Sequence, residues 1–314
     1  MLSGFSVGTD IQEDNQISVS ELFHENSKQQ RYDLAFSRRI SFINNSTDIH
    51  QIISQAFKTY PGATVVTLPE VKPSDGLSFE KTVVQRRSIR DFTGEPLNLI
   101  EVAKLLYFGY GITGALEASG HYTTQLVRAA PSGGALYPVE LYIVISAAER
   151  IEPGIYHYAV AKHALEQLKL GSYSQMLGGS TYQDTIFSRA SATVILTIMF
   201  GRTHFKYGER GYRFALLETG HIAQNILLTA TSLGLGAVAV GGFVDDEINE
   251  TLDIDGVDEA SIYMVAVGRP SPSSKDRGVM EAQSMVDTLL EMLWKDQISF
   301  DNPVDIPPQE TSAV

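Results

Sequence analysis

The segment AAPSGGALYPVELYIVI, residues 129–145, joins a loop with little side-chain chemistry to a continuous apolar run. The run from Val139 to Ile145 predicts a buried strand. Gly133 and Gly134 stand just before it, and a residue without a Cβ lets another group approach the backbone closely. A turn that leads into the strand is one interpretation of this loop. The other is that a flat ring lies against the main chain at the end of the strand.

The rest of the chain predicts helices and strands in irregular alternation. Besides 139–145, buried strands are predicted at 193–200, 237–240 and 262–267, and a hairpin pairs 155–158 with 165–168. Helices are predicted at 18–36, 48–57, 78–85 and 214–233, and another begins at Asn98, where Glu101 completes a capping box. This order lacks a regular βαβ rhythm, so it favours an α+β fold with one mixed central sheet flanked by helices.

The composition is that of a folded protein, with 43% apolar and 19% charged residues among 314. The absence of cysteine excludes disulfides, cysteine-ligated metals and a cysteine nucleophile. A net charge of −13 argues against a nucleic-acid partner. The first residues lack the pattern of a signal peptide, and the most apolar run, 192–200, is too short to span a membrane. We therefore expect a cytoplasmic protein with no membrane segment.

Three regions are expected along the chain. Residues 1–75 are polar and mixed, which predicts an N-terminal extension that packs on the core or on a partner subunit. Residues 76–290 hold the predicted strands and long helices and form the main domain. Residues 291–314 are polar and rich in proline, which predicts a partly disordered tail.

Two common motifs give no support for their usual functions. GYGITG, from Gly109 to Gly114, has the glycine spacing of a dinucleotide-binding loop. It follows a helix instead of a strand, so it predicts a helix terminus and not a Rossmann site. The seven histidines show no paired spacing for metal ligands, and we expect no metal site.

An arginine cluster and a second glycine loop indicate a phosphate-bearing ligand. QRRSIRDF, residues 85–92, contains three arginines and a serine, which suit a phosphate clamp, although a solvated charged turn is the alternative. In VGGF, residues 240–243, the glycines again follow a predicted strand. The candidate binding residues in these segments are Arg86, Arg87, Ser88, Arg90, Gly241 and Gly242. Together with the loop at 131–134, they predict a planar heterocycle that carries a phosphate.

Lys206 and Tyr207 are a candidate catalytic pair directly after the predicted strand 193–200. On the surface they would be an ordinary polar pair. In a dry cavity, either the ammonium would lower the pKa of the phenol, or desolvation would lower the pKa of the lysine. Either change would produce a usable general base.

The combination of motifs resembles the nitroreductase superfamily. The motifs are RRSIRDF, APSGGALYPVELYIV, GIYHY, ETGHIAQNILLTATSLGLGAVAVGGF and VAVGRP, and the likeness extends from about Ser78 to Pro270. Within the superfamily, the chain resembles the SagB-type dehydrogenases, which are flavin-dependent azoline oxidases of peptide-modifying clusters. FHENSK, residues 23–28, resembles the N-terminal segment of that branch.

The resemblance implies a nitroreductase-like homodimer that binds two FMN molecules at its interface. It implies that Arg86, Arg87, Ser88 and Arg90 bind the phosphate and ribityl side, and that Gly241 and Gly242 lie near the isoalloxazine ring. Pro131, Ser132, Gly133 and Gly134 would contact the flavin from the other subunit. A basic residue after the last core strand would also reach the phosphate, and the candidates are Arg269, Lys275 and Arg277.

The resemblance also implies a reaction. Tyr207, assisted by Lys206, would remove a proton while a thiazoline or oxazoline in a ribosomally made peptide is oxidised, and O2 would reoxidise the flavin. A cyclodehydratase would be a possible partner. Two alternatives remain: an NAD(P)H-dependent nitro- or quinone reductase, and a non-catalytic docking subunit of a peptide-modifying complex. Gly241 stands where nitroreductases often carry an acidic residue, which weakens the analogy for nicotinamide use.

Overall fold

The structure is a computed structural model that describes residues 17–46, 48–49, 53, 57–73, 77–116, 125–181 and 183–272. The chain divides into two compact units, Met1–Ser271 and Pro272–Val314. Nearly all of the second unit lies outside the described residues, and so does the predicted C-terminal tail. The fold and the site below therefore belong to the first unit.

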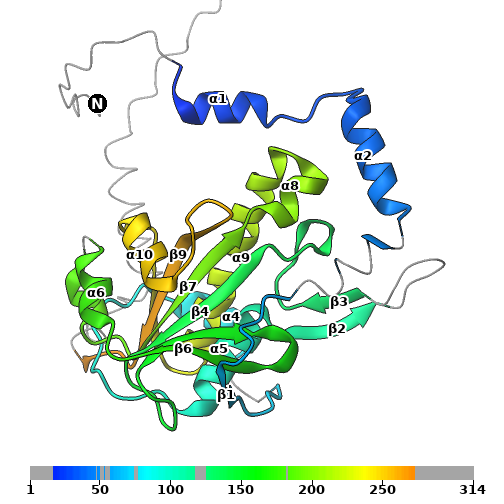
Figure 1. Ribbon diagram of the computed structural model, residues 1–314. Helices are drawn as coiled ribbons and strands as arrows, with labels where there is room; N and C mark the ends of the chain where they lie inside the picture. The colour runs from blue at the N-terminus through cyan, green and yellow to red at the C-terminus, as the bar shows by residue number, and fades with distance from the viewer. Residues whose placement is uncertain are drawn as a thin grey trace, which may run out of the picture. The chain divides into compact units, whose positions relative to one another are not determined.

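A seven-stranded sheet forms the centre of the part that the structure describes (Figure 1). Its order is β1 (Thr64–Thr67), β6 (Ala164–Leu170), β5 (Gly154–Ala159), β4 (Val139–Ile145), β7 (Ala192–Met199), β9 (Glu259–Gly268) and β8 (Gly236–Val240). Neighbouring strands pair antiparallel, and Ser88 adds an isolated parallel bridge to Ala237 in β8. A separate antiparallel pair joins β2 (Ile112–Leu116) to β3 (Gln125–Arg128). The predicted α+β class is confirmed, but the seven strands pair only antiparallel, so the expected mixture of parallel and antiparallel strands is not found among them.

Strand β4 shows how the sheet is buried on both faces. All of its residues are buried, and successive side chains point to opposite faces. Leu141 and Ile143 belong to one apolar cluster, whereas Tyr142 and Val144 belong to the other. A strand that is covered on both faces reads as a continuous apolar run, which explains why the sequence predicted it with the correct bounds.

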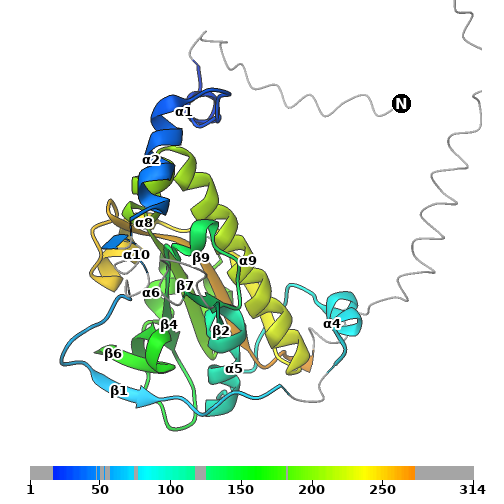
Figure 2. The ribbon, with the colours of Figure 1, turned by 90° about the vertical axis from the view of Figure 1, so that its right-hand side faces the viewer.

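Helices cover the two faces of the sheet. The first cluster includes side chains of α5 (Leu99–Tyr110) and α9 (Arg210–Ser232). The second includes side chains of α6 (Ser174–Gly179), α7 (Asp184–Phe187) and α10 (Asp245–Leu252). Figure 2 shows the long helix α9 running beside β9.

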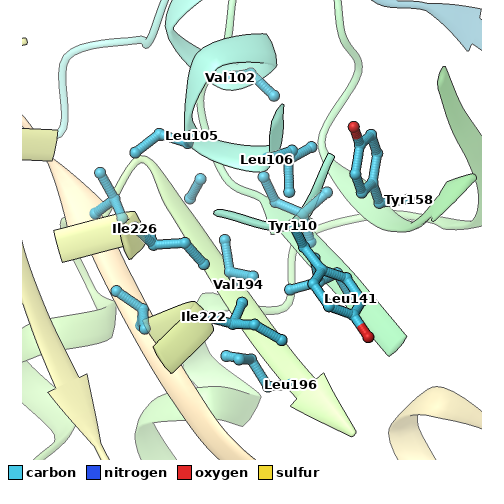
Figure 3. Close-up of a cluster of buried hydrophobic side chains, with 14 of the residues drawn as sticks. Val102, Leu105, Leu106, Tyr110, Leu141, Tyr158, Val194, Leu196, Ile222 and Ile226 are labelled. Carbon is cyan, nitrogen blue, oxygen red and sulfur yellow. The ribbon is translucent and has the colours of Figure 1, made fainter. Parts of the chain in front are cut away.

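Two features of α5 support its packing against α9: the capped N-terminus of α5 and the small residue Gly109. The predicted capping box of α5 is present, because Asn98 and Glu101 bond reciprocally to each other's backbone N–H. An added Cβ on Gly109 would lie 2.8 Å from Ile226 of α9, so the glycine allows the two helices to approach closely. Ile222 and Ile226 meet Leu105 and Leu106 in the cluster of Figure 3.

Further predicted elements are also present. Ser78 caps α4 (Phe79–Gln85) as expected, and β5 and β6 form the predicted hairpin, joined by a short 3-10 turn at Val160–Lys162. Helix α8 (Gly201–Tyr207) lies between β7 and α9 and was not predicted as a helix. The predicted helix at 48–57 lies mostly outside the described residues.

The helix predicted at 18–36 is wrong as a single element. The chain forms α1 (Val19–Asn26) and α2 (Leu34–Asn44), with Asp33 capping the second. The break follows tertiary contacts: Arg213 of α9 donates to the Ser27 hydroxyl at 2.8 Å and to the His24 carbonyl at 2.6 Å. These bonds hold the end of α1 at the start of α9, and α2 packs near α8 (Figures 1 and 2).

Candidate active site

The predicted pair Lys206–Tyr207 lies in the last turn of α8. The side chain of Lys206 is buried and that of Tyr207 is half-buried, with the Lys206 Nζ 5.6 Å from the centre of the Tyr207 ring. Burial lowers the pKa of Lys206 and raises the pKa of Tyr207. Of the two possibilities, the shift of the lysine pKa has the direction that a general base needs, whereas the phenol pKa moves in the opposite direction to the one considered from the sequence.

The glycine loop lies directly against this pair. Gly134 has a φ of 66°, which favours glycine, and an added Cβ would overlap the Tyr207 hydroxyl and lie 3.1 Å from the Lys206 Nζ. An added Cβ on Gly133 would lie 3.5 Å from Phe214, whose ring meets that of Tyr207 edge-on at 5.0 Å. Two segments that are about seventy residues apart in the sequence thus meet within one chain. Gly134 is required by the packing of its own chain.

The second glycine loop has a different environment. An added Cβ on Gly242 would meet nothing within 4 Å, and one on Gly241 would only reach ordinary contact with Tyr263 at 3.4 Å. Neither glycine has the positive φ that would demand it. The packing of the described chain therefore gives no reason for glycine here, and the backbone at the end of β8 is open.

The arginine cluster lies beside the same strand. Ser88 forms its bridge with Ala237 of β8, and the Ile89 N–H donates to the Ala237 carbonyl at 3.0 Å. Strand β8 then runs for three more residues to Gly241. The structure thus brings the RRSIRDF segment and the Gly241–Gly242 loop to one edge strand of the sheet.

The predicted phosphate ligands differ in how free their side chains are. Arg87, Ser88 and Arg90 are exposed, and Arg86 is half-buried. The Arg87 guanidinium donates hydrogen bonds to the backbone carbonyls of Val84 and Arg86, both at 2.8 Å. In contrast, the Arg269 guanidinium binds both carboxylate oxygens of Glu101 at 3.1 to 3.3 Å. Lys275 and Arg277 lie outside the described residues. Of the remaining loop residues, Pro131 is exposed and Ser132 is half-buried.

Sequence reasoning missed a group of buried polar residues behind the glycine loop. Glu218 of α9 is 2% exposed and accepts a hydrogen bond from the Tyr110 hydroxyl at 2.7 Å. The guanidinium of Arg128 lies 4.4 Å from the ring centre of Tyr110 and 4.5 Å from that of Tyr137. One terminal nitrogen of Arg128, Nη1, is buried without a hydrogen-bond partner among the described residues. A lone acid in an otherwise apolar helical pattern was the available signal for Glu218.

A second polar cluster is buried on the sheet itself, and its charges are paired. His157 lies between Glu140 at 3.0 Å and Glu166 at 3.1 Å, and all three side chains are almost fully buried. Glu140 also pairs with Arg202 of α8 at 2.6 Å. Arg202 in turn donates to the Tyr137 carbonyl at 2.9 Å, which ties α8 to the end of the glycine loop.

Two kinds of site are not found within the described ranges. No group of three or more histidine, cysteine, aspartate or glutamate residues there is placed to hold a metal ion. Likewise, no helix in that part of the chain combines the length and apolar character needed to cross a bilayer.

Comparison with known proteins identifies the family. Residues 83–269 match the profile of the Nitroreductase family, and this chain belongs to it. The protein MJ1384 of Methanocaldococcus jannaschii, assigned to the nitroreductases, is 33% identical over 204 residues, which cover 65% of this chain and 96% of that protein. Membership of this family makes the protein an oxidoreductase.

The resemblance to the peptide-processing branch is also confirmed. The microcin B17-processing protein McbC of Escherichia coli is 33% identical over 136 residues, 41% of this chain and 49% of McbC. The match thus spans about half of that relative. A chain of the E. coli microcin synthetase McbBCD complex, solved with truncated pro-MccB17 bound, has the same fold, with a TM-score of 0.51 and 23% identity over 82% of this chain and 98% of that one.

Proposed function

We propose that this protein is an FMN-dependent oxidoreductase that oxidises thiazoline or oxazoline rings in a ribosomally made peptide. The observation that carries the proposal is the contact of Gly134 with Lys206 and Tyr207. It joins the glycine loop and the basic pair, two features of the azoline-oxidising branch, in one place. The similarity to McbC supports a peptide as the substrate class.

The residues present fit FMN. The backbone at Gly241 and Gly242 is open where a Cβ would meet little or nothing of the chain, as a ring stacked on the main chain requires. Arg86, Arg87 and Arg90 lie beside the same strand and could bind the phosphate through charge-assisted hydrogen bonds. Arg269 is the weaker candidate, because its guanidinium is already paired with Glu101. Pro131 to Gly134 would contact the flavin of the partner subunit.

The chain's own residues would handle the proton of the reaction. Conversion of an azoline to an azole removes two hydrogens from the ring. One leaves as a proton, and the other leaves with an electron pair as a hydride. Bound FMN supplies the acceptor for the electron pair, with O2 as the final oxidant. Lys206 would take the proton in its amine form, which burial favours because it lowers the pKa. Tyr207 keeps its phenol proton, because burial raises its pKa, and would orient the ring by donating a hydrogen bond.

Exposed apolar side chains support a homodimer. Phe79 and Val84 on α4 are 70% and 66% exposed, and Leu217 on α9 is 61% exposed. Helices α4 and α9 pack together, so these side chains belong to neighbouring elements. Such surfaces often mark protein interfaces. We expect a dimer in size-exclusion chromatography with light scattering, and a monomer would contradict this part of the proposal. A cyclodehydratase is the partner enzyme that would make the azoline.

The first test is the visible spectrum of the purified protein, with release of its chromophore by heat. A yellow protein that yields FMN and converts an azoline peptide to the azole would support the proposal. A colourless protein that cannot be reconstituted with FMN would contradict it and favour the docking subunit.

An NAD(P)H-dependent nitro- or quinone reductase is the second candidate, favoured by the near-complete coverage of MJ1384. Addition of NAD(P)H to the flavin-loaded protein without air separates the two functions. The azoline oxidase should keep its flavin colour for minutes, whereas the reductase should lose it rapidly.

A further inference from the structure

The backbone of the glycine loop is strained as far as Tyr137, just before β4 begins. Gly134, Ala135 and Tyr137 have φ angles of 66°, 51° and 47°, all in the left-handed region. Alanine and tyrosine adopt this region only at a cost in free energy, because their Cβ atoms crowd the backbone. Such conformations persist where surrounding contacts hold them, and they often occur at functional sites. The contacts of Tyr137 therefore show what keeps the loop in its shape.

Three hydrogen bonds connect Tyr137 to its surroundings. Its N–H donates to the Ser132 hydroxyl oxygen at 2.9 Å, which is a bond within the loop. Its own hydroxyl oxygen accepts from the Arg128 N–H at the end of β3, at 3.1 Å. Its carbonyl accepts from the Arg202 guanidinium at 2.9 Å. This third bond joins the loop to α8, the helix that carries the basic pair.

The Arg202 guanidinium is itself fixed by Glu140 in β4. The Arg202 Nη1 atom lies 2.6 Å from the Glu140 carboxylate and 2.9 Å from the Tyr137 carbonyl, so its two hydrogens can serve both acceptors. The side chains of Arg202 and Glu140 are 14% and 4% exposed. Charge-assisted bonds are strong and directional in such a dry environment. Arg202 thus has one defined position, in contact with both the sheet and the loop.

Helix α8, which follows β7 at the end of the sheet, meets the glycine loop at two points (Figure 1). Arg202 in its first turn bonds to Tyr137, and Lys206, four residues later, lies on the same face of the helix. There the Gly134 backbone is so close that an added Cβ would lie 3.1 Å from the Lys206 Nζ and overlap the Tyr207 hydroxyl. The bond at Arg202 therefore determines how closely the loop covers the basic pair.

We infer that Arg202 is a positioning residue, which holds the strained glycine loop on α8 and so keeps the loop backbone against Lys206 and Tyr207. Glu140 fixes the guanidinium for this role. The inference rests on the proposed function, because holding the loop serves the reaction only if the basic pair takes part in it. Arg202 itself does not touch the reacting atoms in this assignment.

The first test measures hydrogen exchange of the loop amides by mass spectrometry. It uses the full chain without added flavin or substrate, so the result does not depend on turnover. The Ala135 N–H donates to the Ser132 carbonyl at 3.0 Å, so it and the Tyr137 N–H are protected while the loop is in place. Peptides that cover 129–138 report on the loop. Peptides of β4 report on overall stability, because a buried central strand exchanges when the whole fold opens.

Arg202→Met should raise the exchange rate of the loop amides about 10- to 100-fold, as expected for the loss of a hydrogen bond from a charged group. This rate should stay well above that of β4, which shows that the loop opens locally. Arg202→Lys keeps a positive charge beside Glu140 on a side chain that is one bond shorter, so its loop should exchange at an intermediate rate. Glu166→Gln is the matched control. It alters the same buried cluster on the other side of His157, and its loop should exchange as in the wild type.

The second test separates positioning from general support of the fold. The FMN-loaded proteins are compared on an azoline peptide, with rates expressed per bound flavin. Arg202→Met should lower kcat about 10- to 100-fold and change KM by less than about twofold, because Arg202 orients the reacting groups without binding the peptide. Arg202→Lys should recover most of the lost kcat. Glu166→Gln should keep the wild-type kcat.

Wild-type exchange of the loop in Arg202→Met would overturn the inference, and so would loop exchange no faster than that of β4. If Arg202→Met does not fold, Arg202→Gln replaces it, with the same two outcomes. If the loop opens as expected but no azoline is oxidised, the proposed function fails and the hold of Arg202 on the loop remains. If azoline is oxidised while the loop exchanges as in the wild type, the inference fails and the proposed function remains.

Discussion

The two buried polar clusters of this protein differ in how their charges are matched. In the sheet cluster, His157 lies between two glutamates, and Glu140 also holds Arg202. Next to the glycine loop, burial alone shifts the pKa of Lys206, and one nitrogen of Arg128 has no hydrogen-bond partner among the described residues. Removal of one partner from a buried ion pair is strongly destabilising, whereas buried groups whose pKa values are shifted often cluster at functional sites. The comparison therefore supports the proposal that the chemistry takes place beside the loop.

The largest effect on stability is expected in the sheet cluster. Glu140→Ala leaves His157 and Arg202 without their shared partner, and breaking a buried pair in this way should lower the free energy of unfolding by about 3–5 kcal/mol. Urea denaturation measures this change. Glu95→Ala is the control. Glu95 forms an exposed ion pair with Arg269 at 4.0 Å, and its loss should cost less than about 1 kcal/mol. Equal costs for the two variants would remove the distinction between matched and exposed pairs.

The two glycine loops should respond differently to the same substitution. Gly134→Ala introduces an unfavourable φ and an overlap with Tyr207, so it should lower the free energy of unfolding by about 1–3 kcal/mol. Gly242→Ala meets no neighbour and should change it by less than about 0.5 kcal/mol, while weakening the retention of FMN. Thermal unfolding and flavin content measure the two effects. Full FMN retention in Gly242→Ala would show that the open backbone does not contact the ring.

A control substitution with a local effect on stability is available at the start of α5, away from the glycine loop. Asn98→Ala removes the capping bond to the Glu101 N–H and should cost about 1 kcal/mol. Urea denaturation should show this loss of stability. The pKa of the Lys206 amine, followed by trace acetylation at a series of pH values, should not change. A shifted titration would mean that Lys206 responds to general loosening of the fold.

The smallest expected effect is the pH dependence of stability that Lys206 contributes. A lowered pKa means that the unfolded chain binds the Lys206 proton more tightly than the folded one. The contribution of this residue to stability therefore rises with pH between its folded pKa and about 10, its unfolded value. The difference between wild type and Lys206→Met, measured by urea denaturation across this window, should follow that direction. A difference that falls with rising pH would show that Lys206 is stabilised as the ammonium.

The sequence predicted the parts of the fold that depend on local pattern. The bounds of β4 and the capping box at Asn98 came from apolar runs and from side chains that bond within one turn. The split between α1 and α2 was missed, because the capping role of Asp33 was not recognised and the contacts of Arg213 come from far along the chain.

In the candidate site, too, the sequence predicted only what a local motif reveals. Motifs identified the glycine loops, the arginine cluster and the Lys206–Tyr207 pair. They could not reveal that Gly134 packs against that pair, or that burial favours the lysine over the tyrosine as the base. Glu218 was missed because its partner Tyr110 is 108 residues away in the sequence.

The most direct test of the account compares three FMN-loaded proteins on one azoline peptide: wild type, Lys206→Met and Tyr207→Phe. Mass spectrometry follows the loss of two hydrogen atoms per ring, and absorbance confirms equal flavin content. We expect turnover to fall by about 10²–10⁴-fold in Lys206→Met, as for loss of a general base, and by less in Tyr207→Phe. Turnover of Lys206→Met at the wild-type rate, with the flavin bound, would contradict the central claim.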